Sequence, residues 1–233
     1  MQGKRILVAV ELSAIDNAQF QDAWNAPHSV FEERLTSNVW SGRRDGVTSF
    51  AMLKMLSQLH ALKDRGADIS LVAFNGFKDE AQRLRLDTPS SQDGHEAAQA
   101  ENISEAASQR HFDYTLILVG QAHASKTELV HAGSKFQPMA MRLNRAGKVI
   151  SLAMASSGGE AWTCTLKPNV RPTPQQPINS GMLDCGNSHM SGITTLGATQ
   201  HIALGQLSGK ESDAGYDGYY WLGDVTGSSP ARP

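Results

Sequence analysis

The stretch RILVAVEL (residues 5–12) decides the fold of this 233-residue chain. Its apolar residues form a continuous run, which is typical of a parallel strand covered on both faces. Three later runs have the same character: ISLVAF (residues 69–74), YTLILVG (residues 114–120) and VISLAMA (residues 149–155). We therefore predict four strands, the third of them buried like the first.

Helix-forming segments separate these strands. Residues 47–65 form an amphipathic pattern that Gly66 ends in the preferred way. Strands that alternate with helices indicate right-handed crossovers and a parallel sheet. The prediction is an α/β fold, with a mainly parallel central sheet flanked by helices on both faces in three α/β/α layers. The other expected helices cover residues 78–86, 96–110 and 136–145, with a loop at residues 88–94.

Length and composition fit a single α/β domain over residues 1–225, with a disordered tail at residues 226–233. The net charge of -2 gives no reason to expect nucleic acid, so a small-molecule or peptide ligand is the expected partner. No apolar run reaches the roughly 18–20 residues of a membrane span. As written, the chain carries no export signal and is expected in the cytoplasm; it is periplasmic or secreted if an N-terminal signal segment is missing.

Polar side chains follow each expected strand: Glu11, Asn75, His123 and Ser156 with Ser157. Ligands of open parallel sheets bind beyond the carboxyl ends of the strands, so these residues are expected at one edge. His123 is a candidate general base or metal ligand, and the alternative is a surface histidine. Glu11 is a candidate second acid, base or ligand, because a carboxylate beside an imidazole suits water activation.

Other polar residues near these positions are weaker candidates. Arg44 is a candidate catalytic anion clamp, since arginine binds carboxylates and phosphates in bidentate fashion. Asp45 is a candidate ligand-binding residue, although capping of the following helix is its more ordinary role. Gly120 would let the backbone approach a ligand closely, and Lys126 could reach the same pocket as His123.

Cys164 and Cys185 enclose a loop rich in Pro, Asn, Gly and Gln. A disulfide between them would stabilise the fold by ~3 kcal/mol in the chain-entropy model, and two reduced thiols are the alternative. A zinc site with His189 and His201 is disfavoured by the distance of the fourth ligand along the chain. No phosphate-binding loop, dinucleotide fingerprint or nucleophile elbow is present.

An ordered set of motifs resembles bacterial sequences of the ChaN-like and erythromycin-esterase-like branch of the Tiki/TraB superfamily. The motifs are DGVTSFAM, VGQAHASK, QPMAMRL, SSGGEAW with Cys164, DCG and YDGYYWLGDVTGSSPA. The resemblance implies an α/β fold whose site carries two glycine-x-x-histidine motifs and acidic residues. By this resemblance Gly120 and His123 match the second motif, and Glu11 the acidic residue. The first motif has no counterpart, so either the chain lacks the family's first strand or the family's two-histidine site is incomplete in it.

The resemblance implies a hydrolase that acts on an ester or peptide, with possible metal assistance by His123 and Glu11. It implies as an alternative a haem- or iron-binding protein that uses His123 with the aromatic residues Tyr219, Tyr220 and Trp221. A third alternative is a non-catalytic protein with a degenerate site. A divalent metal ion or haem is the expected cofactor in the first two cases.

Overall fold

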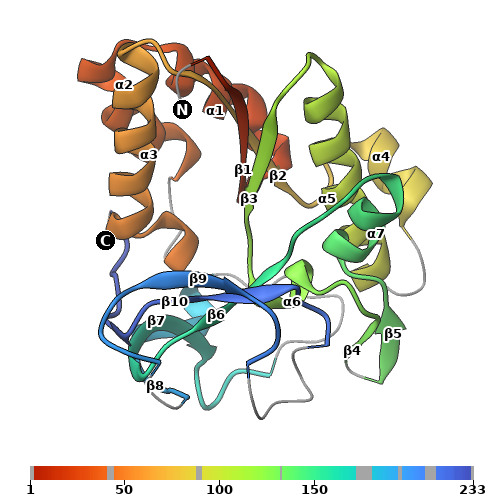
Figure 1. Cartoon of the computed structure of the whole chain (residues 1–233), viewed down its shortest axis with the longest axis vertical. Helices are drawn as coiled ribbons and strands as arrows, with labels where there is room; N and C mark the ends of the chain where they lie inside the picture. Colours follow the sequence, from red (N-terminus) through yellow and green to blue (C-terminus); the bar gives the residue numbers. More distant parts are fainter. Residues whose placement is uncertain are drawn as a thin grey trace.

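The computed structural model describes residues 3–40, 45–87, 91–131, 133–171, 180–193, 196–207 and 214–231. Its centre is a parallel sheet of β1 (Arg5–Ser13), β2 (Asp68–Asn75) and β3 (Tyr114–Leu118), in the order β2-β1-β3. The strand predicted to decide the fold is therefore the middle one. Figure 1 shows helices on both sides of this sheet, which confirms the α/β class.

The two faces of β1 bury two separate cores. Ile6 and Val8 face one core, and Leu7 and Ala9 face the other, because side chains alternate along a strand. The first core is closed by the N-terminal helices and the second by α5 and α7 (Figure 1). The helices are α1 (Asn17–Asn25), α2 (His28–Arg34), α3 (Phe50–Asp64), α4 (Glu80–Leu86), α5 (Ser91–Ser108), α6 (Gln121–Ala124) and α7 (Met139–Ala146).

Strand β3 is an exposed edge, so its predicted burial on both faces is wrong. Only Ile117 packs against the second core, whereas Leu116 and Leu118 are 55% and 40% exposed. The reason is that no helix covers the outer face of β3 and no strand pairs with its free edge in the described part of the chain. Leu116 and Ile117 line a cavity of about 660 Å³ between β3, α5 and α7.

The predicted fourth strand does not join the central sheet. β6 (Leu152–Ala155) pairs in parallel with β10 (Gly218–Trp221), which pairs antiparallel with β9 (His201–Leu204). Asp217 fixes this arrangement, because it accepts the Ser151 N–H just before β6 and pairs with Lys126. The fourth apolar run of the sequence thus forms β6, which pairs with the aromatic strand β10.

A further sheet is formed by β7 (Gly158–Leu166), β8 (Leu183–Ser191) and β11 (Asp224–Val225), and β4 (Leu129–His131) pairs with β5 (Ser134–Phe136). Cys164 lies directly opposite Cys185 in the β7/β8 register, and the two sulfurs are bonded. No helix in the described ranges is long and apolar enough to cross a membrane.

The C-terminal segment, expected to be disordered, is placed as far as residue 231 and lies against the start of α3. The Phe50 N–H donates to the carbonyl of Ser229 at 3.0 Å, and the Ala51 N–H donates to Ser228 Oγ at 2.9 Å. The Ala231 N–H donates to the carbonyl of Thr48. This tail therefore satisfies N–H groups that the first turn of a helix leaves open.

Two helix starts differ from the prediction. Ser49 caps α3, accepting the Met52 N–H, whereas Asp45 precedes a short 3-10 turn and makes no side-chain cap there. Helix α5 begins at Ser91, so a loop over residues 91–94 is wrong, and residues 88–90 lie outside the described residues. Asp93 in the first turn of α5 favours the helix through the dipole and pairs with Arg142 of α7.

Candidate active site

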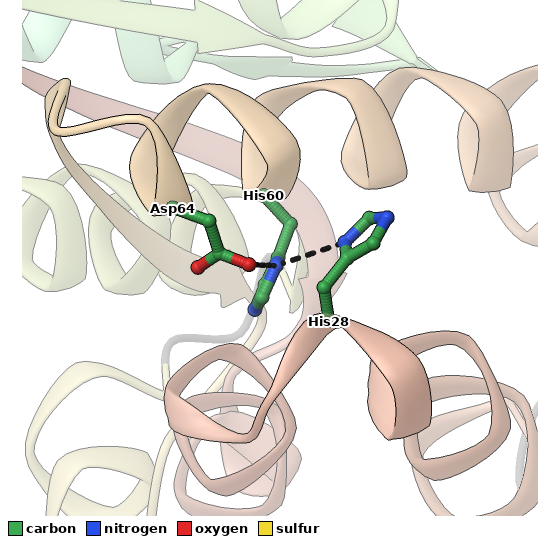
Figure 2. Close-up of side chains that lie close together, drawn as sticks. All are labelled: His28, His60 and Asp64. Carbon is green, nitrogen blue, oxygen red and sulfur yellow. Dashed lines mark hydrogen bonds and ion pairs between the residues drawn. The ribbon is translucent and has the colours of Figure 1, made fainter.

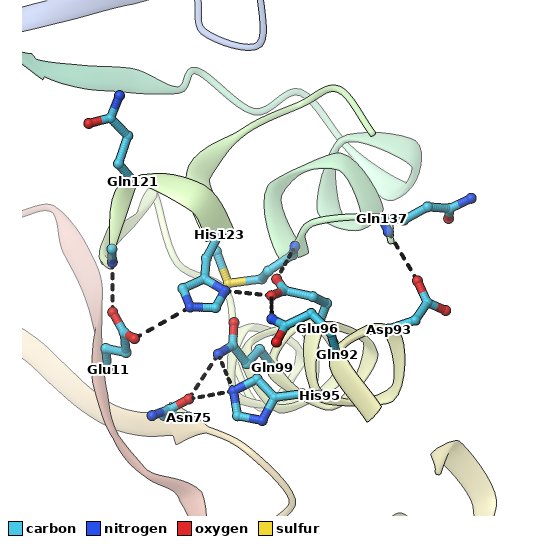
Figure 3. A network of polar contacts seen from close by, with 12 residues as sticks. Glu11, Asn75, Gln92, Asp93, His95, Glu96, Gln99, Gln121, His123 and Gln137 are labelled. Carbon is cyan, nitrogen blue, oxygen red and sulfur yellow. Dashed lines mark hydrogen bonds and ion pairs between the residues drawn. The ribbon is translucent and has the colours of Figure 1, made fainter. Parts of the chain in front are cut away.

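His123 lies in the short helix α6, which begins directly after β3. Gly120 is the N-cap of this helix, and the His123 N–H donates to its carbonyl at 3.1 Å. The turn brings the imidazole back over the carboxyl end of the central sheet. Figure 3 shows the ring between Glu11, which comes from β1, and Glu96, which comes from α5.

Glu96 holds one nitrogen of His123. The Glu96 side chain is fully buried, and its Oε1 lies 2.6 Å from His123 Nδ1. The Gln92 side-chain amide donates to the same oxygen at 2.6 Å, and the Met139 N–H donates to Oε2 at 2.8 Å. Three N–H groups thus converge on the two oxygens of one buried carboxyl group.

Glu11 faces the other nitrogen of His123. Glu11 Oε1 lies 3.6 Å from His123 Nε2, too far for a direct hydrogen bond. Its second oxygen accepts the Gly120 N–H at 2.6 Å, which fixes the carboxylate at the end of β1. The prediction that these two side chains meet at one edge of the sheet agrees with this geometry.

The carboxylates around His123 stabilise its protonated form. Burial lowers the pKa of this imidazole, but the hydrogen bond and charge of Glu96, together with the charge of Glu11, raise the pKa above its ordinary value. When the ring is neutral, its proton belongs on Nδ1, where Glu96 accepts it. The lone pair of Nε2 then points toward Glu11, which is the orientation a general base requires.

A second polar cluster lies beside the first. His95 Nε2 is 2.9 Å from Asn75 Oδ1, and the Gln99 side-chain amide donates to the same oxygen at 2.8 Å. The ring centroids of His95 and His123 are 6.1 Å apart. Burial lowers the pKa of His95 despite the charge of Glu96, so this ring is the neutral partner of the two histidines.

Gln99 carries a buried acceptor without a partner among the described residues. Its side chain is fully buried, and Oε1 makes no hydrogen bond there. A buried carbonyl oxygen of this kind costs free energy unless water or a ligand donates to it. In Figure 3 Gln99 lies beside Asn75 and His95, next to His123. Gln99 Oε1 is therefore a buried acceptor that no described residue satisfies.

Other residues singled out from the sequence lie elsewhere. Lys126 forms an ion pair with Asp217 at 2.5 Å and thereby ties α6 to the segment before β10. The backbone carbonyl of Asp45 accepts a hydrogen bond from the Thr48 hydroxyl at 3.1 Å. Ser157 bonds to Asp224, so it belongs to the C-terminal sheets.

Arg44, the predicted anion clamp, lies outside the described residues, as does Arg43. The clamp stays a prediction. Trp221, expected in an aromatic haem-binding patch, is 1% exposed, and its indole N–H donates to the Gly197 carbonyl. That side chain has a structural partner and offers no surface to a haem ring.

Sequence reasoning missed Glu96, His95 and Gln99, which all lie on α5. Their spacing holds a signal, because Gln92 with Glu96 and His95 with Gln99 are i,i+4 pairs. That signal could have marked α5 as part of the site.

A metal ion at His123 and Glu11 would have two protein ligands. Catalytic zinc sites hold the ion with three protein ligands and one open position. Within the described ranges, no third His, Cys, Asp or Glu completes such a group with these two residues. Nδ1 of His123 is also committed to Glu96. The metal role of the pair therefore stays a prediction, and general-base chemistry at this site needs only the side chains.

No family model matches this sequence, and no curated protein matches it. Among solved structures, the chain is similar to a mutant of the erythromycin esterase EreC in its open conformation, with 10% identity and a TM-score of 0.47 over 81% of this chain and 69% of that chain. It is also similar to the type III effector HopBA1, with 18% identity and a TM-score of 0.39 over 75% of this chain and 70% of that chain. Because both scores are below 0.5, neither similarity assigns an activity to this chain. The affiliation with the Tiki/TraB superfamily stays a prediction.

Proposed function

We propose that this protein is a hydrolase in which His123 acts as the general base on water that attacks an ester or peptide carbonyl. The observation that carries the proposal is the line of three side chains Glu96, His123 and Glu11. A buried carboxylate fixes the ring tautomer, and the free nitrogen faces a second carboxylate. A base oriented by a third group is the recurring arrangement of hydrolytic sites.

The 3.6 Å gap between His123 Nε2 and Glu11 Oε1 suits a shared water molecule. A water about 2.8 Å from each atom fits this separation. His123 takes the proton of that water as the oxygen attacks the carbonyl, and Glu96 stabilises the imidazolium that results. His123 then donates that proton to the leaving oxygen or nitrogen as the bond between that atom and the carbonyl carbon breaks.

The apolar cavity beside β3 supports a substrate with an apolar part. Its lining includes Val119 and Ala124, which flank the segment from Gly120 to His123. No member of the polar cluster lines the cavity itself, so its role is binding and not chemistry. An acyl chain or apolar ring placed there would lie next to the end of the sheet.

The test is hydrolysis of a panel of nitrophenyl esters of different acyl length and of fluorogenic peptides by the purified chain. We expect His123→Ala to reduce kcat/KM by about 100-fold or more, because a positioned base contributes roughly 10²–10⁴-fold. Glu11→Gln should reduce it less. His111→Ala, which removes an exposed histidine, is the matched control and should leave turnover unchanged.

Gly120→Ala provides a steric test that removes no functional group. A methyl group there would lie 3.5 Å from Glu11 Oε2 and 3.6 Å from His123 Cδ2, at ordinary contact distance from both. The φ of -58° is compatible with alanine. We expect a folded variant with turnover close to that of the unaltered chain, because the methyl group displaces neither side chain. If the panel shows no turnover above His123→Ala, the proposal is wrong.

A further inference from the structure

His60 of α3 is a fully buried histidine outside the site described above. Its Nε2 lies 3.1 Å from the carbonyl oxygens of both Trp24 and Ala26. Because carbonyl oxygens only accept hydrogen bonds, Nε2 carries the proton and Nδ1 carries the lone pair. Burial, together with the charge of Lys63, lowers the pKa of this ring, which agrees with the neutral form.

The lone pair of His60 faces two further ligand-type atoms. Nδ1 of His28 lies 3.2 Å from His60 Nδ1, and Oδ2 of Asp64 lies 3.4 Å from it. The three atoms all lie within 4.8 Å of one another. Figure 2 shows His60 and Asp64 on successive turns of α3 and His28 at the start of α2. Two separate helices thus direct nitrogen and oxygen atoms to one point.

We propose that His28, His60 and Asp64 form a binding site for a divalent transition metal ion of the zinc class. Two imidazole nitrogens and one carboxylate oxygen are a donor set that Zn²⁺ accepts. Bonds of about 2.0–2.1 Å in a tetrahedron place neighbouring ligand atoms about 3.3 Å apart. The two separations at His60 Nδ1 match this edge length.

The surroundings of His60 have the features of a metal-binding histidine. Its second nitrogen is held by backbone carbonyls, which fix the ring and its tautomer as outer partners of metal-bound histidines do. The side chains of His28 and Asp64 are exposed, so solvent can supply the fourth ligand. The positive charge of Lys63 opposes the binding of a cation at this place, although Lys63 Nζ donates to the Trp24 carbonyl.

One adjustment is required. The rings of His28 and His60 lie 29° from parallel, with centroids 5.2 Å apart, so an ion in the plane of His60 needs a turn of the His28 ring. His28 is exposed at the first position of α2 and can make that turn. The bound ion would join α2 to α3 and stabilise the folded helix pair by mass action.

The test is isothermal titration of the EDTA-treated, desalted full chain with zinc chloride, and with cobalt chloride for its visible absorption. We expect one equivalent of Zn²⁺ and the intense cobalt bands of a tetrahedral site. His28→Ala and Asp64→Asn change exposed side chains and should keep the fold. Loss of an outer partner weakens metal binding roughly 10- to 100-fold, so loss of a ligand should weaken it at least as much.

Two controls place the ion. His111→Ala changes an exposed histidine elsewhere and should bind Zn²⁺ as the unaltered chain does. His123→Ala should also bind it, because the proposed hydrolase site is separate. Absence of Zn²⁺ binding would overturn the inference, leaving a hydrogen bond between His28 and His60. Binding that survives His28→Ala, or that disappears with His123→Ala, would overturn it as well.

Discussion

Replacing Glu96 by glutamine should reverse the tautomer of His123. When the glutamine oxygen accepts the Met139 N–H, its NH₂ group lies against His123 Nδ1, and the Gln92 amide must turn so that its oxygen accepts from that NH₂ group. Two donors cannot share one hydrogen bond, so Nδ1 must lose its proton and Nε2 must carry it. The nitrogen that faces Glu11 would no longer be a base, and turnover should fall although His123 itself is intact.

The change should also lower the pKa of His123. A hydrogen bond to a charged group contributes about 1.5–3 kcal/mol, and one pKa unit corresponds to about 1.4 kcal/mol. The loss of Glu96 as a carboxylate should therefore lower the His123 pKa, because a stabilisation of this size is removed from the imidazolium form. Glu11 still acts on the ring in the variant, so part of the upward shift remains.

The same change makes a prediction for stability against pH. Because the folded-state pKa of His123 is raised, its contribution to stability is fully present below the unfolded value of about 6.5 and is lost as pH rises through the folded pKa. The free energies of unfolding of the unaltered chain and of Glu96→Gln, measured in urea, should therefore differ most below a pH of about 6.5. This difference should shrink as pH rises through the folded-state pKa of His123.

The direct assay is NMR of histidine ring nitrogens and protons over a pH series, which distinguishes the two tautomers. Glu105→Gln, the same change on the exposed face of α5, is the matched control and should leave the His123 titration unchanged. An unaltered His123 pKa and tautomer in Glu96→Gln would refute the reasoning. So would a His123 in the native chain that titrates below its ordinary value.

Two further predictions concern stability. Phe20→Ala should lower the free energy of unfolding by about 3–5 kcal/mol in urea, because Phe20 is completely buried in the first core. Reduction of the disulfide between Cys164 and Cys185 should lower the free energy of unfolding by ~3 kcal/mol or less. Free thiols in native protein from an oxidising compartment would contradict the disulfide.

The central sheet was predictable because its signal is local. An unbroken apolar run such as residues 5–12 has one common explanation, a strand covered on both faces, and β1 is that strand. The run that became β3 looks the same in sequence yet lies at an edge. Whether a neighbour covers a strand depends on residues far along the chain, and composition does not contain that information.

The residues of the candidate site also divide into those with a local sequence signal and those without one. His123 and Glu11 were found because each follows a strand, and parallel strands bring their ends together. Glu96 lies 27 residues before His123 on a helix, and only the packing of α5 against α7 brings it under the ring. The group formed by His60 and His28 was missed for a similar reason, since its two histidines come from different helices.

The contact between the C-terminal tail and α3 bears on how the chain can be assembled. The Ala51 N–H and the Ser228 hydroxyl are 177 residues apart in sequence, so the first turn of α3 acquires this partner only after residue 228 has been synthesised. Contacts of such long range form late and slow the approach to the native state. The start of α3 is therefore completed only after residues 228 and 229 are available, and any segment fused behind them needs a spacer that leaves both serines in place.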